Sequence, residues 1–316
     1  MAEANLRYSP RVYVAGNTGM VGSAICRKMS AENYCVIKPS TRVDLTNQND
    51  VNQMVSELRP DWIFLAAARV GGIHANSTYP ADFVYVNLMI ECNLIRAAFE
   101  NDVKKLLFLG SSCIYPRNCP QPIKEEYLLS DYLEPSNKPY AIAKIAGIIM
   151  AQSFSSQYGC NYISVMPSNL YGPYDNFDLK ESHVIPALLR KTHEAKMSGA
   201  SYVEIWGTGR PFREFLHVDD LADACLFLMR NYDSPELINI GSGYDQTVFE
   251  LARIIKEVVG YQGEIRFNPA MPDGTPRKLL DISRLKALGW NPSISLRDGL
   301  RLTYRWYLEN ENVARK

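Results

Sequence analysis

The sequence predicts an α/β fold: a doubly wound parallel sheet (a Rossmann fold) followed by a smaller C-terminal α/β lobe that binds substrate. Three observations support this prediction. Short apolar segments alternate with segments of helical periodicity through the first half of the chain. The first apolar segment ends in a glycine-rich turn. The length, 316 residues, suits one large α/β domain or two linked ones.

Five apolar segments of the first half are short enough to be buried strands. They lie at 11–16, 34–38, 61–68, 104–112 and 161–167. Helical spacing occurs between them, in SAICRKMSAE, from Phe83 to Phe99, and in AIAKIAGIIMAQSF. Because strands that alternate with helices pair in parallel, these segments predict one twisted sheet covered on both faces.

The pattern loosens after about residue 175, where a second unit is expected to begin. VIPALLRKTHEA and VFELARIIKEVVG have helical periodicity, YVEIW and LINIGSG are strand candidates, and PAMPDGTPRK (269–278) has the prolines of a loop. We therefore expect a Rossmann domain at 1–175, to which the chain returns at about 213–243. A substrate-binding lobe would occupy 176–316.

The overall composition argues against several classes of partner. Acidic and basic residues balance at 34 each, which gives no general reason to expect nucleic acid or an anionic membrane as partner. The seven cysteines are scattered without a C-x-x-C motif, as in proteins of a reducing compartment. The N-terminus lacks the apolar core of a signal peptide, and no segment of about 18 apolar residues occurs. We expect a soluble, cytoplasmic protein.

The turn after the first strand has the spacing G-x-x-G-x-x-G and opens a helix. Glycines let a backbone turn tightly and approach a pyrophosphate, while a helix N-terminus offers free N–H groups. An ordinary glycine-rich turn is the alternative. The turn predicts a dinucleotide site made by Gly16, Asn17, Thr18, Gly19, Met20, Val21 and Gly22.

The end of the second strand indicates which dinucleotide is bound. An acidic residue there would bind the ribose hydroxyl of NAD, but the segment KPSTRVDL has Arg42 instead. An arginine suits the 2′-phosphate of NADP, unless it is simply a solvated loop residue. Asp44 is expected near the adenine or as the cap of the next helix. Small residues 66–68 would let a cofactor lie close to the third strand, although tight packing explains them almost as well.

A tyrosine and a lysine four residues apart occur twice, as YCVIK (34–38) and YAIAK (140–144). On a strand the two side chains would be about 13 Å apart, whereas on a helix they share one face. Ser111 ends the fourth strand, at the edge where open α/β sheets bind ligands. With Tyr140 and Lys144 it forms a set in which the ammonium, helped by an oxidised nicotinamide, lowers the pKa of the phenol for proton exchange with a carbonyl or alcohol.

The sequence also resembles the extended short-chain dehydrogenase/reductase family of nucleotide-sugar enzymes, from residue 12 to the end. The segments that carry the resemblance are GMVGSAI, AAARVGGI, TYPADF, LLFLGSSCIYP, PYAIAKIAG, NLYGP, SHVIPALLR, REFLHVDD and PDGTPRKLLD. The branch it resembles epimerises a GDP-4-keto-6-deoxymannose at carbons 3 and 5 and then reduces the 4-keto group with NADPH. The resemblance also implies a homodimer, paired through the helix at about 83–99 and the helix with Tyr140.

The resemblance assigns a role to each matching residue. Tyr140 would give a proton to the 4-keto oxygen, with Lys144 and Ser111 as partners. Cys113 and His183 would be the base and the acid of epimerisation, which is sensible because protons beside a ketone are acidic. Without the resemblance, Cys113 would be interpreted as a buried thiol and His183 as a helix cap.

Further binding residues follow from the same match. Pro167, Ser168, Asn169 and Leu170 would line the nicotinamide, and the remaining cofactor positions are Leu45, Ala67, Leu109, Gly110, Ser112, Lys144 and His183. The GDP sugar would be held by Lys191, Trp206, Arg213, Asp273 and Lys278. His217, Asp219 and Asp220 lie together in sequence, but as a capping segment, and no metal is expected.

Two positions depart from the family pattern, and three alternatives stay open. Thr18 and Lys191 stand where relatives often have arginine, so NADP preference depends mainly on Arg42, and Lys191 keeps a charge without bidentate geometry. A dehydratase would need an acid–base carboxylate where Cys113 and Ile114 stand. A 4-epimerase with bound NAD would need an acid in place of Arg42. A non-catalytic NADP-binding protein of the same fold would be expected to lose the Tyr–Lys pair.

Overall fold

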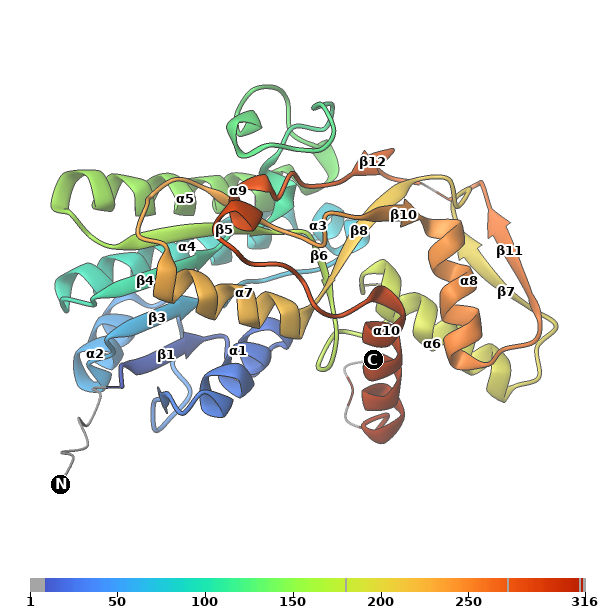
Figure 1. Cartoon of the computed structure of the whole chain (residues 1–316), viewed down its shortest axis with the longest axis horizontal. Helices are drawn as coiled ribbons and strands as arrows, with labels where there is room; N and C mark the ends of the chain where they lie inside the picture. The colour runs from blue at the N-terminus through green and yellow to red at the C-terminus, as the bar shows by residue number, and fades with distance from the viewer. Residues whose placement is uncertain (1–8, 180, 272, 313, 315–316) are drawn as a thin grey trace.

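A computed structural model describes residues 9–179, 181–271, 273–312 and 314. Figure 1 shows two α/β parts side by side, a larger one that contains the first half of the chain and a smaller one made mostly of the second half. The predicted fold class is confirmed: a parallel six-stranded sheet is joined to a smaller lobe. In the part of the chain that is described, no helix has the length and apolar character needed to cross a bilayer.

The large sheet has the strand order β2-β1-β3-β4-β5-β9, with every pair parallel. Its strands are β1 (Arg11–Ala15), β2 (Cys35–Ile37), β3 (Trp62–Leu65), β4 (Lys105–Leu109), β5 (Tyr162–Pro167) and β9 (Ile238–Ile240). The order reverses between β1 and β3, and the carboxyl ends of parallel strands share one edge. The cofactor-binding edge is therefore the one after β1, β3, β4 and β5.

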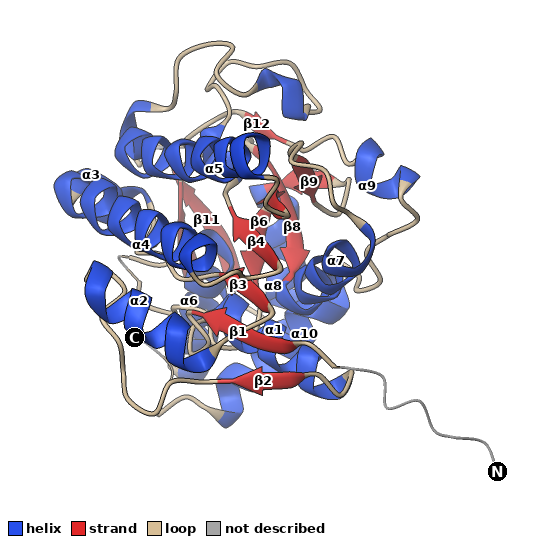
Figure 2. Cartoon of the chain, turned by 90° about the vertical axis from the view of Figure 1, so that its left-hand side faces the viewer, coloured by secondary structure: helices blue, strands red, loops and turns tan. Residues whose placement is uncertain are grey.

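Helices cover both faces of this sheet, as Figure 2 shows. On one face lie α2 (Gln48–Leu58), α4 (Pro80–Glu100) and α5 (Lys138–Tyr158), and on the other α1 (Met20–Ala31) and α7 (Val218–Asn231). The strand β1 illustrates why both faces are apolar: Val12 and Val14 pack in one cluster, Tyr13 and Ala15 in the other. Parallel strands buried on both faces have this nearly continuous apolar sequence.

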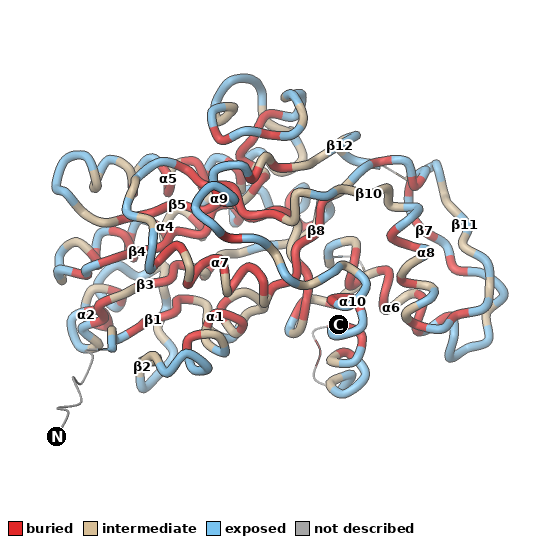
Figure 3. The backbone as a smooth tube through the Cα atoms, viewed as in Figure 1, coloured by how far each residue is buried: buried red, intermediate tan, exposed pale blue. Residues whose placement is uncertain are grey.

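The smaller lobe has its own apolar core. A sheet of order β10-β8-β12, with β6 also paired to β8, and a two-stranded sheet β11-β7 pack against helices. These elements are β6 (Asn169–Tyr171), β7 (Tyr202–Trp206), β8 (Phe212–His217), β10 (Asp245–Thr247), β11 (Glu264–Asn268), β12 (Arg277–Lys278), α6 (Val184–Met197), α8 (Val248–Val259) and α10 (Leu296–Glu309). Figure 3 shows this core as buried segments behind exposed outer turns. The short helices α3 (Ile73–Thr78) and α9 (Ser283–Ala287) complete the chain.

Helix ends follow local sequence signals. Thr247 and Glu250 form a capping box at the start of α8, and Gly260 ends this helix with a φ of 74°. All five strands predicted in the first half are present, although each is shorter than its apolar segment. One prediction was wrong in part: the loop at 269–278 ends in β12, whose two residues pair with β8. Pro272 of this loop lies outside the described residues.

Candidate active site

The glycine turn after β1 has the geometry of a phosphate-binding turn. Gly16 has a φ of +83°, and a Cβ there would lie 2.9 Å from the Cα of Ala67. A Cβ on Gly22 would lie 2.1 Å from the carbonyl oxygen of Gly16. Gly19 begins α1 without a side-chain cap. Any larger residue at Gly16 or Gly22 would displace backbone, and the first N–H groups of α1 have no side-chain cap, so the turn fits a dinucleotide pyrophosphate.

The loop after β2 exposes Arg42 at the position expected for a 2′-phosphate contact. Asp44 accepts hydrogen bonds from the N–H and the hydroxyl of Thr46, at 2.9 Å and 2.8 Å, and these bonds lower its pKa. The alternative that Asp44 caps the next helix is wrong, because Asn47 caps α2 through the N–H groups of residues 49 and 50. The other expectation, a place near the adenine, stays a prediction.

Ser111, Tyr140 and Lys144 meet at the carboxyl end of β4. The Ser111 hydroxyl hydrogen-bonds the phenol of Tyr140 and accepts the N–H of Cys113 at 3.3 Å. The Nζ of Lys144 lies 6.0 Å from the centre of the Tyr140 ring, one helical turn away. The other Tyr–Lys pair is used differently, since the hydroxyl of Tyr34 accepts a hydrogen bond from Arg230. Only the pair on α5 reaches this edge of the sheet.

The pKa of Tyr140 departs from the sequence expectation. Burial raises the pKa of this phenol, the charges of Cys113 and Glu91 raise it further, and the hydrogen bond from Ser111 lowers it. A lowering by Lys144 was expected, but the ammonium lies 3.0 Å from the carboxylate of Glu91 and donates to the carbonyl of Leu109 at 2.9 Å. The positive charge of Lys144 is therefore largely balanced by Glu91 and does little to lower the pKa of Tyr140.

Sequence reasoning missed Glu91, which is 1% exposed in the middle of the apolar helix α4. The signal was present: a single acidic residue stands among apolar residues between Phe83 and Phe99. A buried carboxylate needs a partner of opposite charge. The partner could not be identified without the packing of α4 on α5.

Cys113, Lys278 and His183 lie around the same site. Cys113 is half-buried in the turn after β4, and the Nζ of Lys278 lies 3.6 Å from its Sγ. His183 begins α6, and although solvent reaches its ring, burial and the charge of Lys278 lower its pKa. The structure thus brings the proposed base of epimerisation next to the tyrosine set, with a cation beside the thiol.

The smaller lobe adds basic and aromatic residues next to the site that contains Cys113. Lys278 on β12 pairs in register with Arg213 on β8, so the two cations are neighbours. The Nζ of Lys191 lies 5.0 Å from the centre of the Trp206 ring, in a cation–π contact. Asp273 accepts the N–H and hydroxyl of Thr208, at 2.7 Å and 2.8 Å, which anchors the loop that leads to Lys278.

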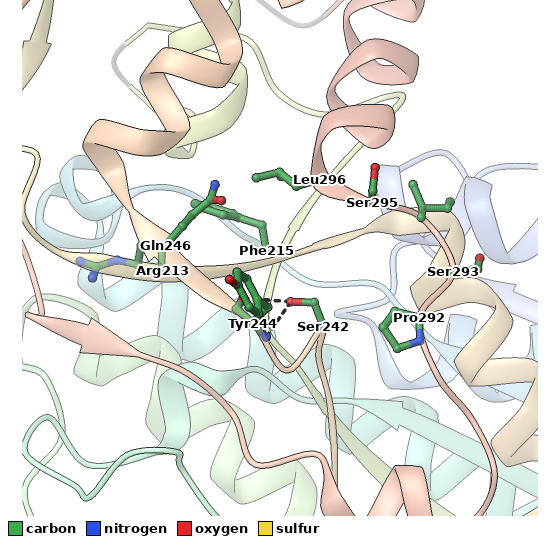
Figure 4. Close-up of a pocket in the computed structure, with 10 residues that line it drawn as sticks. Arg213, Phe215, Ser242, Tyr244, Gln246, Pro292, Ser293, Ser295 and Leu296 are labelled. Atoms are coloured by element: carbon green, nitrogen blue, oxygen red, sulfur yellow. Dashed lines mark hydrogen bonds between the residues drawn. The ribbon is translucent and has the colours of Figure 1, made fainter.

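A cavity of about 390 Å³ lies beside Arg213, between the lobe sheet and the segment 292–296. Figure 4 shows Arg213 and Gln246 on one side of it and Pro292, Ser293 and Ser295 on the other. The guanidinium donates to the carbonyl of Asp273 at 3.2 Å, and burial lowers its pKa. Arg213 therefore stands between this cavity and the Asp273 loop.

The remaining expected residues take structural places near the same edge. Asn169 donates to the carbonyl of Glu214 at 2.8 Å, and Ser168 donates its N–H to Ile240, so the strand end expected at the nicotinamide is firmly held. His217 caps α7 by accepting the N–H of Asp219. Among the described residues no group of His, Cys, Asp and Glu is arranged to hold a metal ion.

Comparison with known proteins gives a consistent result. The NAD dependent epimerase/dehydratase family matches residues 12–241. The chain is 57% identical over 304 residues to GDP-L-fucose synthase 1 of Arabidopsis thaliana, covering 96% of this chain and 94% of the relative. It is 53% identical over 316 residues to GDP-L-fucose synthase of Escherichia coli, with 96% and 98% covered. A structure of a GDP-L-fucose synthetase from Naegleria fowleri bound to NADP superimposes with a TM-score of 0.91 at 27% identity, covering 98% of each chain.

Proposed function

We propose that this chain, which belongs to the NAD dependent epimerase/dehydratase family, converts GDP-4-keto-6-deoxy-D-mannose to GDP-L-fucose. It does so by epimerisation at carbons 3 and 5, followed by NADPH-dependent reduction of the 4-keto group. One observation carries the proposal: the residues expected to epimerise the substrate and those expected to reduce it lie in the same site. Cys113 lies close enough to Tyr140 for its charge to raise the pKa of the phenol, and Ser111 hydrogen-bonds to both residues.

Epimerisation is assigned to Cys113 and His183. The Sγ thiolate takes a proton from the carbon beside the ketone, and the His183 imidazolium gives a proton to the opposite face. Lys278, 3.6 Å from Sγ, stabilises negative charge on the sulfur. Because the pKa of His183 is lowered, its protonated ring is a strong proton donor. Both groups then return to their starting state by exchange with water, so solvent hydrogen enters the substrate.

Reduction is assigned to Tyr140, with Lys144 and Ser111 as partners. NADPH supplies the hydride when it is bound. Tyr140 gives its phenolic proton to the 4-keto oxygen, and its raised pKa keeps the proton in place until that oxygen develops negative charge. Ser111 fixes the phenol and can also donate to the substrate oxygen.

The binding roles follow from position. The turn at Gly16, Gly19 and Gly22 would receive the pyrophosphate of NADP, and Arg42 its 2′-phosphate. The neighbouring cations Arg213 and Lys278 suit the diphosphate of a GDP sugar. Lys191, whose pKa burial lowers, is a monodentate contact beside Trp206. These residues continue from the Cys113 site to the outer lobe.

A homodimer and a cytoplasmic location complete the proposal. The helices α4 and α5 pack on each other and still expose large apolar side chains: Tyr85 is 61% exposed, Ile142 42% and Ile149 44%. A second copy would remove these side chains from water. All seven cysteines are free thiols, which suits a reducing compartment. Light scattering of the purified chain should give the mass of a dimer.

The direct test is oxidation of NADPH with GDP-4-keto-6-deoxymannose, with the product identified by NMR. The unaltered chain should form GDP-L-fucose. Cys113→Ser should be far slower, because epimerisation precedes reduction. Cys119→Ser, a half-buried cysteine of the same loop, is the matched control and should stay active. Equal oxidation by the chain and by Cys113→Ser, with a 6-deoxy sugar of unchanged C3 and C5 as product, would show a simple ketoreductase.

A further inference from the structure

A fully buried acid lies behind the reduction site and has no part in the chemistry proposed above. Glu91 is on α4, 1% exposed, where α4 packs against α5. Burial raises the pKa of its carboxyl, and the charge of Lys144 acts in the opposite direction. Isolated charges are strongly disfavoured in such surroundings. The carboxylate is held there by the ammonium of Lys144, which is itself 2% exposed.

The neighbouring helix is shaped to admit this carboxylate. Gly147 lies on α5, one turn after Lys144, and a Cβ there would meet Glu91 Oε2 at 2.7 Å and the ring of Phe108 at 2.5 Å. Glycine is among the least favourable residues in a helix interior. A buried ion pair can often be replaced by apolar residues without loss of stability. The ring of Phe108 is enough to explain the glycine, but packing alone does not explain the acid.

We propose that Glu91 is a positioning residue for the reduction, which fixes the ammonium of Lys144 beside Tyr140 and balances its charge so that the phenol keeps its proton until the ketone takes it. This inference rests on the proposed function. The acid acts through Lys144 and does not touch the substrate. The ion pair with the Glu91 carboxylate and the hydrogen bond to the Leu109 carbonyl hold the Lys144 ammonium in place.

Few other charges face this pair. From α5 come Lys144 and Tyr140, from the turn after β4 comes Cys113, and on α4 itself Cys92 has its pKa raised by burial and by Glu91. The negative charges of Glu91 and Cys113 both oppose ionisation of the phenol. Removing Glu91 removes one of these two opposing charges.

The expected result of Glu91→Gln is a shift in the pH profile of kcat. Without the carboxylate, the unbalanced charge of the ammonium lowers the pKa of Tyr140. The alkaline loss of kcat should therefore begin about one pH unit lower, with kcat about tenfold lower on that limb. Glu91→Asp, which keeps the charge on a shorter side chain, should recover part of the shift.

The controls separate this role from a structural one. Glu125→Gln removes another buried carboxylate, 6% exposed, and should leave the pH profile in place. Deuterium uptake at carbons 3 and 5 in heavy water without NADPH should be the same in Glu91→Gln as in the unaltered chain. If Glu91→Gln does not fold, Glu91→Met has a similar volume, leaves the Leu109 carbonyl as acceptor for the ammonium, and carries the same expectation.

Two results would overturn the inference: an unmoved alkaline limb in the folded variant, or a loss of deuterium uptake equal to the loss of reduction. The second would mean that Glu91 only holds the fold of the whole site. Failure of the proposed function is distinguishable, because then the unaltered chain would neither take up deuterium nor oxidise NADPH with this substrate.

Discussion

Replacing Lys278 by methionine should slow epimerisation without removing the base. The Nζ of Lys278 lies 3.6 Å from the Sγ of Cys113, and methionine keeps the length of the side chain without its charge. At this distance the attraction between unit charges is about 1 kcal/mol in water-like surroundings and about 5 kcal/mol at an effective dielectric constant of 20. Because Lys278 is half-exposed, solvent screening favours the lower part of this range. Proton removal should slow about tenfold to a hundredfold.

The assay for Lys278→Met is deuterium uptake into GDP-4-keto-6-deoxymannose at carbons 3 and 5, followed by NMR with NADPH left out. Lys124→Met is the matched control, because Lys124 is an exposed lysine of the neighbouring loop, paired with Glu126 at 3.7 Å. Reduction of a ketone that is already epimerised should change much less than uptake. Uptake at the unaltered rate in Lys278→Met would refute the reasoning, since the thiolate would then need no cation.

Two further predictions concern the cofactor and pH. Arg42→Ala should raise the KM for NADPH about tenfold or more and leave the KM for NADH nearly unchanged, because only NADPH has the 2′-phosphate; steady-state kinetics with both cofactors measure this. Glu214 is fully buried, and burial raises the pKa of its carboxyl from 4.5 to about 7. The Glu214 carboxyl therefore binds a proton more tightly in the folded chain than in the unfolded chain. The stabilisation that results is fully present below the pKa of the unfolded state and is lost as the pH rises to about 7. The free energy of unfolding by urea should fall by about 3 kcal/mol across this window from this group, and Glu214→Gln should lack this component; equal slopes in both chains would contradict the assignment.

Elements with strong periodicity could be predicted because their own residues decide them. The apolar segments of β1, β3, β4 and β5 and the helical spacing of α1, α4 and α5 were sufficient to predict the parallel sheet. The strand β12 could not be predicted, because its two residues pair with β8 from a loop rich in proline and glycine. Short strands of this kind exist through tertiary pairing and not through local propensity.

The candidate site divides in the same way. Tyr140 and Lys144 could be paired from sequence, because one helix fixes their spacing. The contacts of Lys278 with Cys113 and of Glu91 with Lys144 join residues that are 165 and 53 positions apart, and spacing contains no information on them. The raised pKa of Tyr140 in the chain without cofactor could not be predicted for the same reason. It depends on burial and on a carboxylate that only the packing of α4 against α5 brings near.

The two lysines of the site have different partners, and this difference suits the order of the reaction. Cys113 must ionise first, to take a proton from carbon, while Tyr140 must keep its proton until the hydride arrives. Lys278 faces the thiol and supports a negative charge on it, whereas Lys144 is already balanced by the buried carboxylate of Glu91. A thiolate on Cys113 in turn raises the pKa of Tyr140. The base of epimerisation therefore helps the acid of the reduction to keep its proton. Epimerisation before reduction is therefore the order that the charges of this site favour.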